Sequence, residues 1–529
     1  YVSAGAHMGD QNIGIGLGSC QLLMSGANRN IGIGTYSHQG ATADQSSATA
    51  YNIAIGISAM RYVKGGNQNV AIGNEALTNL SSGYQNVVLG SFAGQDMTTG
   101  FDNVLLGYNA GLNITTGDSN VAIGTNALYT SLLSDDTVAI GFDALYSQTV
   151  DGTSFNTAIG TKAGRSITTG TENTIVGYYA GYAVDSGVSS NTLIGTYAMY
   201  AGDGDDNVCV GLNTAQNAGD MNYGTFVGSK AGGVGAITGD ANIAIGYTSA
   251  YNLTSGVQNV ALGMNALYAN TTGNYNVALG DSAMWSTGDS ISSPTGTVSI
   301  GYFSGRYPEG SYNTFVGYSA GKGSTGTRTS NLNTAIGREA MSNTQSDSEN
   351  VALGAGAMEL STGSHLNVVI GRGAMNSVLT ANRNVAVGYY SMESFVGTSN
   401  TYNTALGFYA GKDLTTGVNN TILGASNDGH AMTTASDNTF VGYEAGSTVT
   451  GNYNTIIGTE AGEFSTGVSN NVVVGRQAWG VGVGTGDDNV VMGSLALLSG
   501  TSAAENVIIG YNAAGNATTT QRTVVIGND

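Results

Sequence analysis

The fold is decided by one short stretch, residues 103–119, which reads Asn-Val-Leu-Leu-Gly-Tyr-Asn-Ala-Gly-Leu-Asn-Ile-Thr-Thr-Gly-Asp-Ser. Residues 120–124, Asn-Val-Ala-Ile-Gly, begin the same phrase again. Thirty glycines close such a phrase, from Gly16 to Gly527, and their bare spacing is 17 residues. Self-similarity at a fixed period indicates stacked structural repeats. Positions are numbered here from this motif glycine, so the opening asparagine is position −4.

Each phrase predicts one short β-strand. Position −3 is Val, Ile or Thr, position −1 is aliphatic, and position −2 is apolar or small in most copies. Because side chains alternate along a strand, this pattern predicts a strand that is buried on both faces. The sequence therefore predicts an all-β chain in which residues 1–529 form one continuous parallel β-solenoid of about 30 coils. Intervals longer than 17 residues are expected to bulge as loops.

Two positions of the repeat exchange volume. A large residue at −2 goes with glycine at +4, as in Phe226 with Gly232, and alanine at −2 goes with a large residue at +4, as in Ala71 with Leu77. Close packing penalises both voids and overfilling, so the two side chains are predicted to share one space. Ala158 with Gly164 departs from this rule.

Asparagine occupies position −4 in 26 of the 30 copies. Stacked asparagine side chains hydrogen-bond between successive coils, so position −4 is interpreted as a structural ladder, represented by Asn69, Asn86, Asn103 and Asn120. The glycines of the Thr-Thr-Gly corners, such as Gly100, Gly170 and Gly273, are expected to supply a positive φ.

Composition argues against several functions. A net charge of −20 with only 15 Lys and Arg residues argues against nucleic-acid binding, which needs clustered cations. No run of eighteen apolar residues predicts membrane insertion, and no signal segment is recognisable at the N-terminus. Cys20 and Cys209 lie in distant coils and are not expected to pair.

No metal, cofactor or catalytic set is predicted, and the chain is interpreted as a non-enzyme. His7, His38, His365 and His430 have no ligand partners at suitable spacing and are interpreted as loop residues. The acidic turns at 135–136, 203–206 and 487–488 are interpreted as solvated corners, with calcium binding as the alternative. A polysaccharide-degrading surface enzyme with paired carboxylates is the enzymatic alternative.

The phrase Asn-Val-Ala-Ile/Leu-Gly-x-x-Ala, at residues 69–76, 120–127 and 350–357, resembles the head repeat of YadA-like trimeric autotransporter adhesins. It is also similar to repeats of some bacteriophage tail fibres that carry Thr-Thr-Gly turns. The resemblance implies a left-handed β-roll and, together with the two-sided apolar strands, a homotrimer. A monomeric solenoid with a wide interior is the alternative.

The tail-fibre relationship is favoured, because the adhesin head unit is shorter and no coiled-coil stalk or membrane barrel is recognisable here. Residues 522–529 are similar to the place where such fibres pass into a self-cleaving chaperone domain, which would lie beyond Asp529 and be removed. The implied function is a rod-like spacer of a virion tail fibre that contributes to host attachment. A bacterial cell-surface adhesin or extracellular filament subunit is the alternative.

The expected partners are other fibre or tail proteins and a host-surface glycan or protein receptor. Loops vary without cost to stacked strands, so recognition is predicted in the longer insertions at 36–51, 285–297 and 323–331. Tyr36 and Trp285 are candidates for stacking on sugar rings, and Asp289 for accepting hydroxyl hydrogen bonds. The competing interpretation is that these loops only relax the register and that another protein binds the host.

Overall fold

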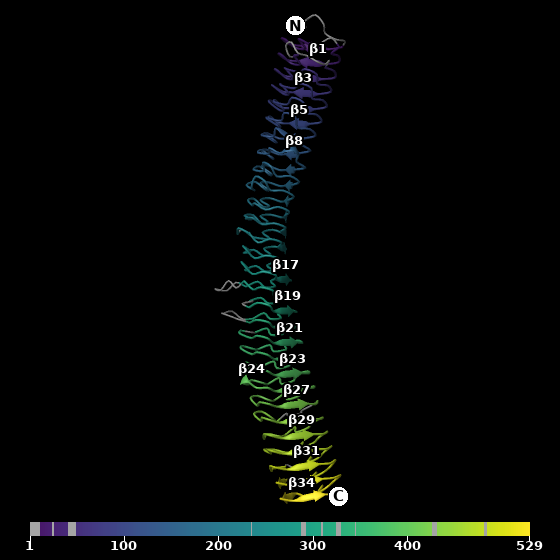
Figure 1. Ribbon diagram of the computed structural model, residues 1–529, viewed down its shortest axis with the longest axis vertical. Helices are drawn as coiled ribbons and strands as arrows, with labels where there is room; N and C mark the ends of the chain where they lie inside the picture. The colour runs from purple at the N-terminus through teal and green to yellow at the C-terminus, as the bar shows by residue number, and fades with distance from the viewer. Residues whose placement is uncertain are drawn as a thin grey trace. The chain divides into compact units, whose positions relative to one another are not determined.

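The computed structural model describes residues 11–23, 26–40, 49–233, 235–286, 293–307, 310–323, 330–343, 345–425, 431–480 and 484–529. Within these residues the secondary structure consists of strands and turns, without helix. The chain divides into two compact units, residues 1–259 and 260–529. In each unit one short strand follows another, coil after coil (Figure 1). The predicted fold class, an all-β parallel β-solenoid with a 17-residue repeat, is confirmed.

Unit 1 contains fourteen motif strands among its described residues, each covering positions −3 to −1. They pair in parallel and in register, so that Leu105 lies beside Ala122 of the next coil. Their bounds are β1 Ile13–Ile15, β2 Ile31–Ile33, β3 Ile53–Ile55, β4 Val70–Ile72, β5 Val87–Leu89, β6 Val104–Leu106, β7 Val121–Ile123, β9 Val138–Ile140, β11 Thr157–Ile159, β12 Thr174–Val176, β13 Thr192–Ile194, β14 Val208–Val210, β15 Thr225–Val227 and β16 Ile243–Ile245.

Unit 2 repeats the arrangement with sixteen motif strands in its described part, again paired in parallel and in register. Their bounds are β17 Val260–Leu262, β18 Val277–Leu279, β19 Val298–Ile300, β20 Thr314–Val316, β21 Thr334–Ile336, β22 Val351–Leu353, β23 Val368–Ile370, β25 Val385–Val387, β27 Thr404–Leu406, β28 Thr421–Leu423, β29 Thr439–Val441, β30 Thr455–Ile457, β31 Val472–Val474, β32 Val490–Met492, β34 Val507–Ile509 and β36 Val524–Ile526.

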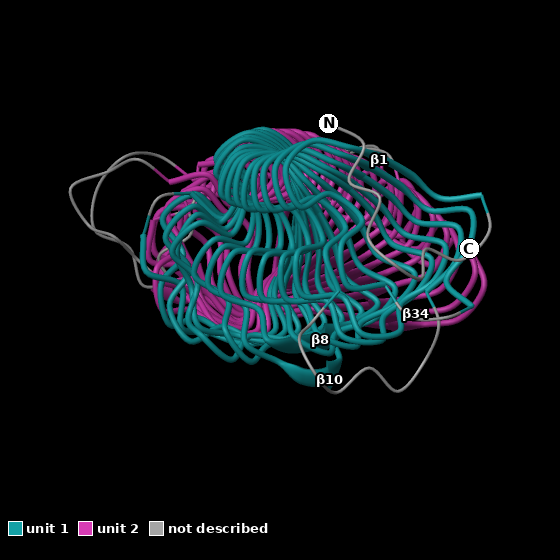
Figure 2. Cartoon of the chain, turned by 90° about the horizontal axis from the view of Figure 1, so that it is seen from above, with its two compact units in different colours: residues 1–259 teal, residues 260–529 magenta. Residues whose placement is uncertain are grey.

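Three pairs of side strands stand apart from the motif strands. Unit 1 has β8 (Leu133–Asp135) paired with β10 (Asp151–Thr153), which lie together at one edge of the teal unit in Figure 2. Unit 2 has β24 (Thr380–Asn382) with β26 (Thr398–Asn400), and β33 (Ser502–Ala504) with β35 (Thr519–Gln521). Each of these pairs is parallel, as are the pairs of motif strands.

The motif strands are buried on one face, not on both. The middle residue points inward, and Ala71, Leu105 and Phe226 are fully buried. The residues at −3 and −1 point outward, and Ile72 and Val87 expose 36% and 38% of their surface in the single chain. The prediction of two buried faces is therefore wrong for the isolated chain, because a narrow coil encloses only one side of its strand.

Three positions of the repeat contribute much of the interior of each coil. Alanine at +3 and the residues at −2 and +4 are buried. A Cβ built on Gly232 would lie 2.6 Å from the Phe226 ring, which confirms that −2 and +4 share one space. The exception at Gly164 has a physical reason, since Leu145 and Ile175 of the adjacent coils reach to 2.9 and 3.0 Å of the same point.

The asparagines at −4 form a hydrogen-bonded ladder inside the coils. The backbone N–H and the side-chain Nδ2 of Asn103 both donate to Oδ1 of Asn86, each at 3.0 Å. Nδ2 also donates to the carbonyl of Gly117, 2.9 Å away. Oδ1 of Asn103 accepts from the backbone N–H of Asn120 at 2.9 Å, and all of these asparagines are fully buried. Asn69 continues the ladder, with Nδ2 3.1 Å from Oδ1 of Asn52.

At Thr137, where asparagine is missing from −4, a neighbouring side chain completes the ladder. Thr137 takes the place of asparagine, and its N–H still donates to Oδ1 of Asn120. The buried Gln148 donates to the Thr137 hydroxyl at 3.1 Å and accepts from Nδ2 of Asn156 at 3.1 Å. Position +7, where Gln148 lies, carries an apolar core residue in many other coils, such as Leu80. Buried polar groups cost free energy unless they are hydrogen-bonded, which explains this substitution.

A second ladder, which the sequence interpretation missed, runs at position −6. Here the side-chain oxygen of the later coil accepts from the backbone N–H of the earlier coil, the reverse of the direction at −4. Oδ1 of Asp118 accepts from Phe101 at 2.8 Å, and Oδ1 of Asp135 accepts from Asp118 at 2.8 Å. Asn, Ser and Thr serve in the same way elsewhere, as Asn67 does for Ala50. Coils that carry Asp, Asn, Ser or Thr at −6 are thus held from both sides.

The corner glycines are needed for space and not for a positive φ. Gly100, Gly170 and Gly273 are absent from the left-handed region, so the expected reason is wrong. A Cβ on Gly100 would lie 2.5 Å from the carbonyl oxygen of Gly117 in the next coil. At Gly100 the close approach of the next corner therefore leaves no room for a side chain.

His38 is a core residue, which corrects its interpretation as a loop residue. It occupies position +4 after Gly34, where many other coils place Leu or Met, and it is fully buried. Neither ring nitrogen has a hydrogen-bond partner among the residues that the structure describes. Burial lowers the pKa of His38 to about 4. His365 is half-buried, and His7 and His430 lie outside the described residues.

This histidine makes the first coils sensitive to acid. The folded pKa is below the ordinary value of 6.5, so the unfolded chain binds more protons between pH 6.5 and 4. The contribution of His38 to the free energy of unfolding is therefore fully present above pH 6.5. It falls by about 3 kcal/mol in all as the pH drops to 4. We expect His38→Leu to remove this part of the acid sensitivity. Hydrogen exchange of the β2 amides, corrected for intrinsic rates, measures it; equal acid sensitivity in both proteins would contradict the assignment.

Candidate surface-recognition site

The two aromatic recognition candidates lie on the repeat itself and not within the inserted loops. Tyr36 is at position +2 after Gly34, half-buried, with the Arg61 guanidinium 4.9 Å from its ring centroid. Trp285 is at +5 after Gly280 and is also half-buried. Tyr36 belongs to unit 1 and Trp285 to unit 2. Asp289 and the loop interiors at 41–48, 287–292 and 324–329 lie outside the described residues.

Trp285 is part of an aromatic cluster around one arginine. The Arg306 guanidinium lies 4.6 Å from the Trp285 ring centroid and 4.1 Å from that of Phe303. Tyr268 of the preceding coil lies 6.4 Å from Trp285, centroid to centroid. A guanidinium over an aromatic face gains cation–π attraction, and here it covers a face that a sugar ring would use. The expected stacking role of Trp285 therefore competes with Arg306.

Unit 1 carries a longer column of flat side chains at position +5, which we call the tyrosine–arginine column. Tyr129 and Tyr146 stack with centroids 4.9 Å apart and planes 1° from parallel. The Arg165 guanidinium follows, 4.9 Å from the Tyr146 centroid and 5.8 Å from that of Tyr182. Tyr200 completes the column, 5.3 Å from Tyr182 at an interplanar angle of 18°. Five consecutive coils thus contribute one flat group each.

The column presents its edges to solvent. Its stacked ring pairs are nearly parallel and follow one another at close to the ~4.8 Å spacing of stacked strands, so their faces cover one another. All five side chains are half-buried. Within the described part of unit 1, the hydroxyls of Tyr146, Tyr182 and Tyr200 make no hydrogen bond to protein. These hydroxyls are therefore available to a ligand.

Two cations accompany the column. Lys162 Nζ donates to the Tyr179 hydroxyl at 2.9 Å and lies 5.6 Å from the Tyr182 ring centroid. This hydrogen bond raises the pKa of Lys162 and lowers the pKa of Tyr179. Arg165 Nε lies 3.5 Å from Oδ2 of the buried Asp143. Lys162 and Arg165 belong to the same coil, that of β11.

The sequence interpretation looked for recognition residues in loops and motifs and so missed the column. The column arises because residues at the same repeat position of successive coils lie beside one another. Its signal is present: Tyr129, Tyr146, Arg165, Tyr182 and Tyr200 all stand five residues after a motif glycine. Side chains at equal positions stack in a solenoid, so reading each position down the repeats would have found it.

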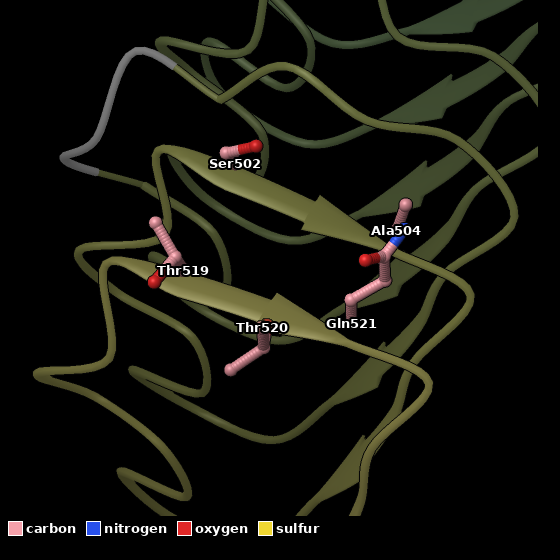
Figure 3. Close-up of a pocket in the computed structure, with 5 residues that line it drawn as sticks. All are labelled: Ser502, Ala504, Thr519, Thr520 and Gln521. Carbon is pink, nitrogen blue, oxygen red and sulfur yellow. The ribbon is translucent and has the colours of Figure 1, made fainter.

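A pocket in unit 2 is lined by side chains that do not ionise. It lies over β33 and β35 and is lined by Ser502, Ala504, Thr519, Thr520 and Gln521 (Figure 3). None of these side chains ionises, and Figure 3 shows them spread along the two strands without converging on a point. General acid–base and metal chemistry both need groups of another kind.

The acidic turns serve the second ladder. Asp135, Asp205 and Asp487 each accept a backbone N–H of the preceding coil, at 2.8, 2.7 and 2.7 Å. Burial raises the pKa of Asp118, and the neighbouring charges of Asp135, Asp102 and Asp136 raise it further. Among the described residues, no three His, Cys, Asp or Glu side chains are grouped so as to hold a metal ion.

The two cysteines are buried and free. Burial raises the pKa of Cys209 to about 12, so its thiol stays protonated.

No protein-family model matches the chain, and no curated protein matches its sequence. In the described ranges, no helix has the length and apolar character that crossing a bilayer requires.

Proposed function

We propose that the chain is a structural spacer of an extracellular fibre, in the setting of a virion tail fibre, and that it assembles as a homotrimer contributing to host attachment. The observation that carries this proposal is the outward face of the motif strands. Positions −3 and −1 are the apolar or Thr residues that the repeat retains in every copy, yet they are half-exposed in the single chain.

This outward face forms an apolar band within each unit, which we call the outer band. In unit 1 it includes Ile123, Ile159 and Ile194, each 37–38% exposed. In unit 2 it includes Leu262 at 46% and Leu406 at 49%. Soluble monomers rarely expose a contiguous apolar patch of more than a few hundred Å². A band that repeats with the coil suits burial against copies with the same period, and the resemblance to trimeric fibres favours three of them.

The outer band is tested by replacing Ile123, Ile159 and Ile194 together with threonine. These isoleucines are at −1, on the same outward face as −3, where threonine occurs in the native repeat; threonine also favours strands, so strand formation is preserved. Each change removes about 1 kcal/mol of apolar burial per subunit, so we expect the trimer to dissociate at micromolar concentration. Sedimentation velocity of wild type and variant measures the change.

The matched control removes exposed apolar side chains outside the outer band. Leu132 and Leu133 expose 49% and 37% of their surface, and Leu132→Thr with Leu133→Thr should leave the trimer intact. Equal sedimentation of the band variant, the control and the wild type would reject the outer band as the interface.

A further inference from the structure

The tyrosine–arginine column combines many hydrogen-bond donors with little charge. Tyr146, Tyr182 and Tyr200 offer free hydroxyls at their half-exposed edges, while Arg165 and Lys162 supply the positive charge. The carboxylate among them is that of Asp143, which is buried and already paired with Arg165. The exposed edge is therefore rich in donors and positive, on a chain whose net charge is −20.

The pattern discriminates between classes of linear polymer. Nucleic acid carries a phosphate at each nucleotide and is bound through many clustered cations, which this face does not have. A polysaccharide with carboxylates at intervals carries many hydroxyls and few charges. Its hydroxyls suit the tyrosine edges, and its carboxylate suits the planar, bidentate guanidinium of Arg165.

The geometry of the column also favours one orientation of a bound polymer. The five flat groups come from consecutive coils, which follow one another at the ~4.8 Å spacing of stacked strands. A polymer that lies along the coil axis therefore meets one flat side chain per coil, whereas a polymer across the coils meets one in total. Stacking also fixes the tyrosines before binding, which lowers the entropy cost of association.

We propose that the tyrosine–arginine column binds an anionic, carboxylate-bearing polysaccharide laid along the coil axis. This inference rests on the proposed attachment function and names its ligand class. The sugar hydroxyls exchange hydrogen bonds with the tyrosine edges, and Arg165 and Lys162 hold the carboxylates. Trp285 and its Arg306 are not part of this surface.

Binding of the purified full chain to polygalacturonate, measured by affinity electrophoresis, tests the proposal, with neutral dextran as the comparison polymer. We expect binding to polygalacturonate and none to dextran. Arg165→Gln with Lys162→Gln should weaken binding roughly tenfold or more, because two charge-assisted contacts are lost. Tyr182→Phe keeps the stacked ring and removes one hydroxyl, so a smaller loss of about threefold is expected.

The control is Lys230→Gln, which removes another cation of unit 1 at position +2, outside the column. Equal weakening by this control, or equal binding of dextran, would overturn the proposal. Unchanged binding by the double variant would do the same. Circular dichroism establishes that each variant is folded. The mass of the wild-type assembly is measured on the same samples. A trimer that does not bind polysaccharide would refute the binding role of the column and leave the proposed trimer standing. A monomer that binds polysaccharide would refute the trimer and leave the binding role standing.

Discussion

Replacing Gly107 with alanine is expected to destabilise the coils around it by several kcal/mol. Gly107 has φ +143°, and a Cβ there would lie 2.5 Å from the carbonyl oxygen of Gly124. The substitution therefore combines backbone strain of about 1–2 kcal/mol with a clash between two backbones that are fixed by strand pairing. Neither side can move without breaking the hydrogen bonds of β6 to β7.

Hydrogen exchange at β6 and β7 measures this effect, since neighbouring repeats are coupled and distant ones are not. Gly152 provides the matched control. It also has a positive φ, +90°, but a Cβ there would meet nothing within 4 Å. Gly152→Ala should cost only the strain, about 1–2 kcal/mol. If the two substitutions cost the same, the close approach between motif glycines is not what selects glycine.

Replacing Asn103 with leucine is expected to cost about 3–5 kcal/mol, because buried groups lose their partners. The N–H of Asn120 and the carbonyl of Gly117 each lose a hydrogen bond to the Asn103 side chain, and Asn86 loses one donor. Leucine has a similar volume, so packing alone would predict a small effect. The difference between these two expectations makes the substitution informative.

Urea unfolding of wild type and Asn103→Leu, together with local exchange at β6 and β7, measures the loss. Thr116→Ala is the control, since Thr116 is exposed in the same coil. A cost for Asn103→Leu no larger than that for Thr116→Ala would show that the ladder is incidental to stability.

The sequence was sufficient for the features that every coil repeats. Period, strand position, the exchange between −2 and +4 and the ladder at −4 all follow from local rules applied thirty times. Phe226 with Gly232 shows why: the two residues lie in one coil, so their volumes are linked along the chain.

Features that depend on what lies beside a coil were harder to predict. The half-exposure of Ile72 depends on the width of the coil, which the strand pattern does not encode. The ladder at −6 was not evident from the sequence, because the accepting residue is Asp, Asn, Ser or Thr in different coils. His38 was misplaced because its residue type suggested a loop, although its distance from Gly34 is that of a core position. Distance from the motif glycine is the better guide in a solenoid.

The recognition candidates show the same distinction. Tyr36 and Trp285 were chosen for their closeness to insertions, and both lie at repeat positions with an arginine over the ring. The tyrosine–arginine column emerges only when equal positions of several coils are compared. In a repeat protein, functional residues are therefore better found by comparing the same position in successive coils than by reading neighbouring residues along the chain.

The mass of the assembled protein tests the central claim most directly. Native mass spectrometry at micromolar concentration should give a species of three times the chain mass of 53.4 kDa, because we propose that the outer band is buried between three copies. A species of one chain mass at that concentration would contradict the account.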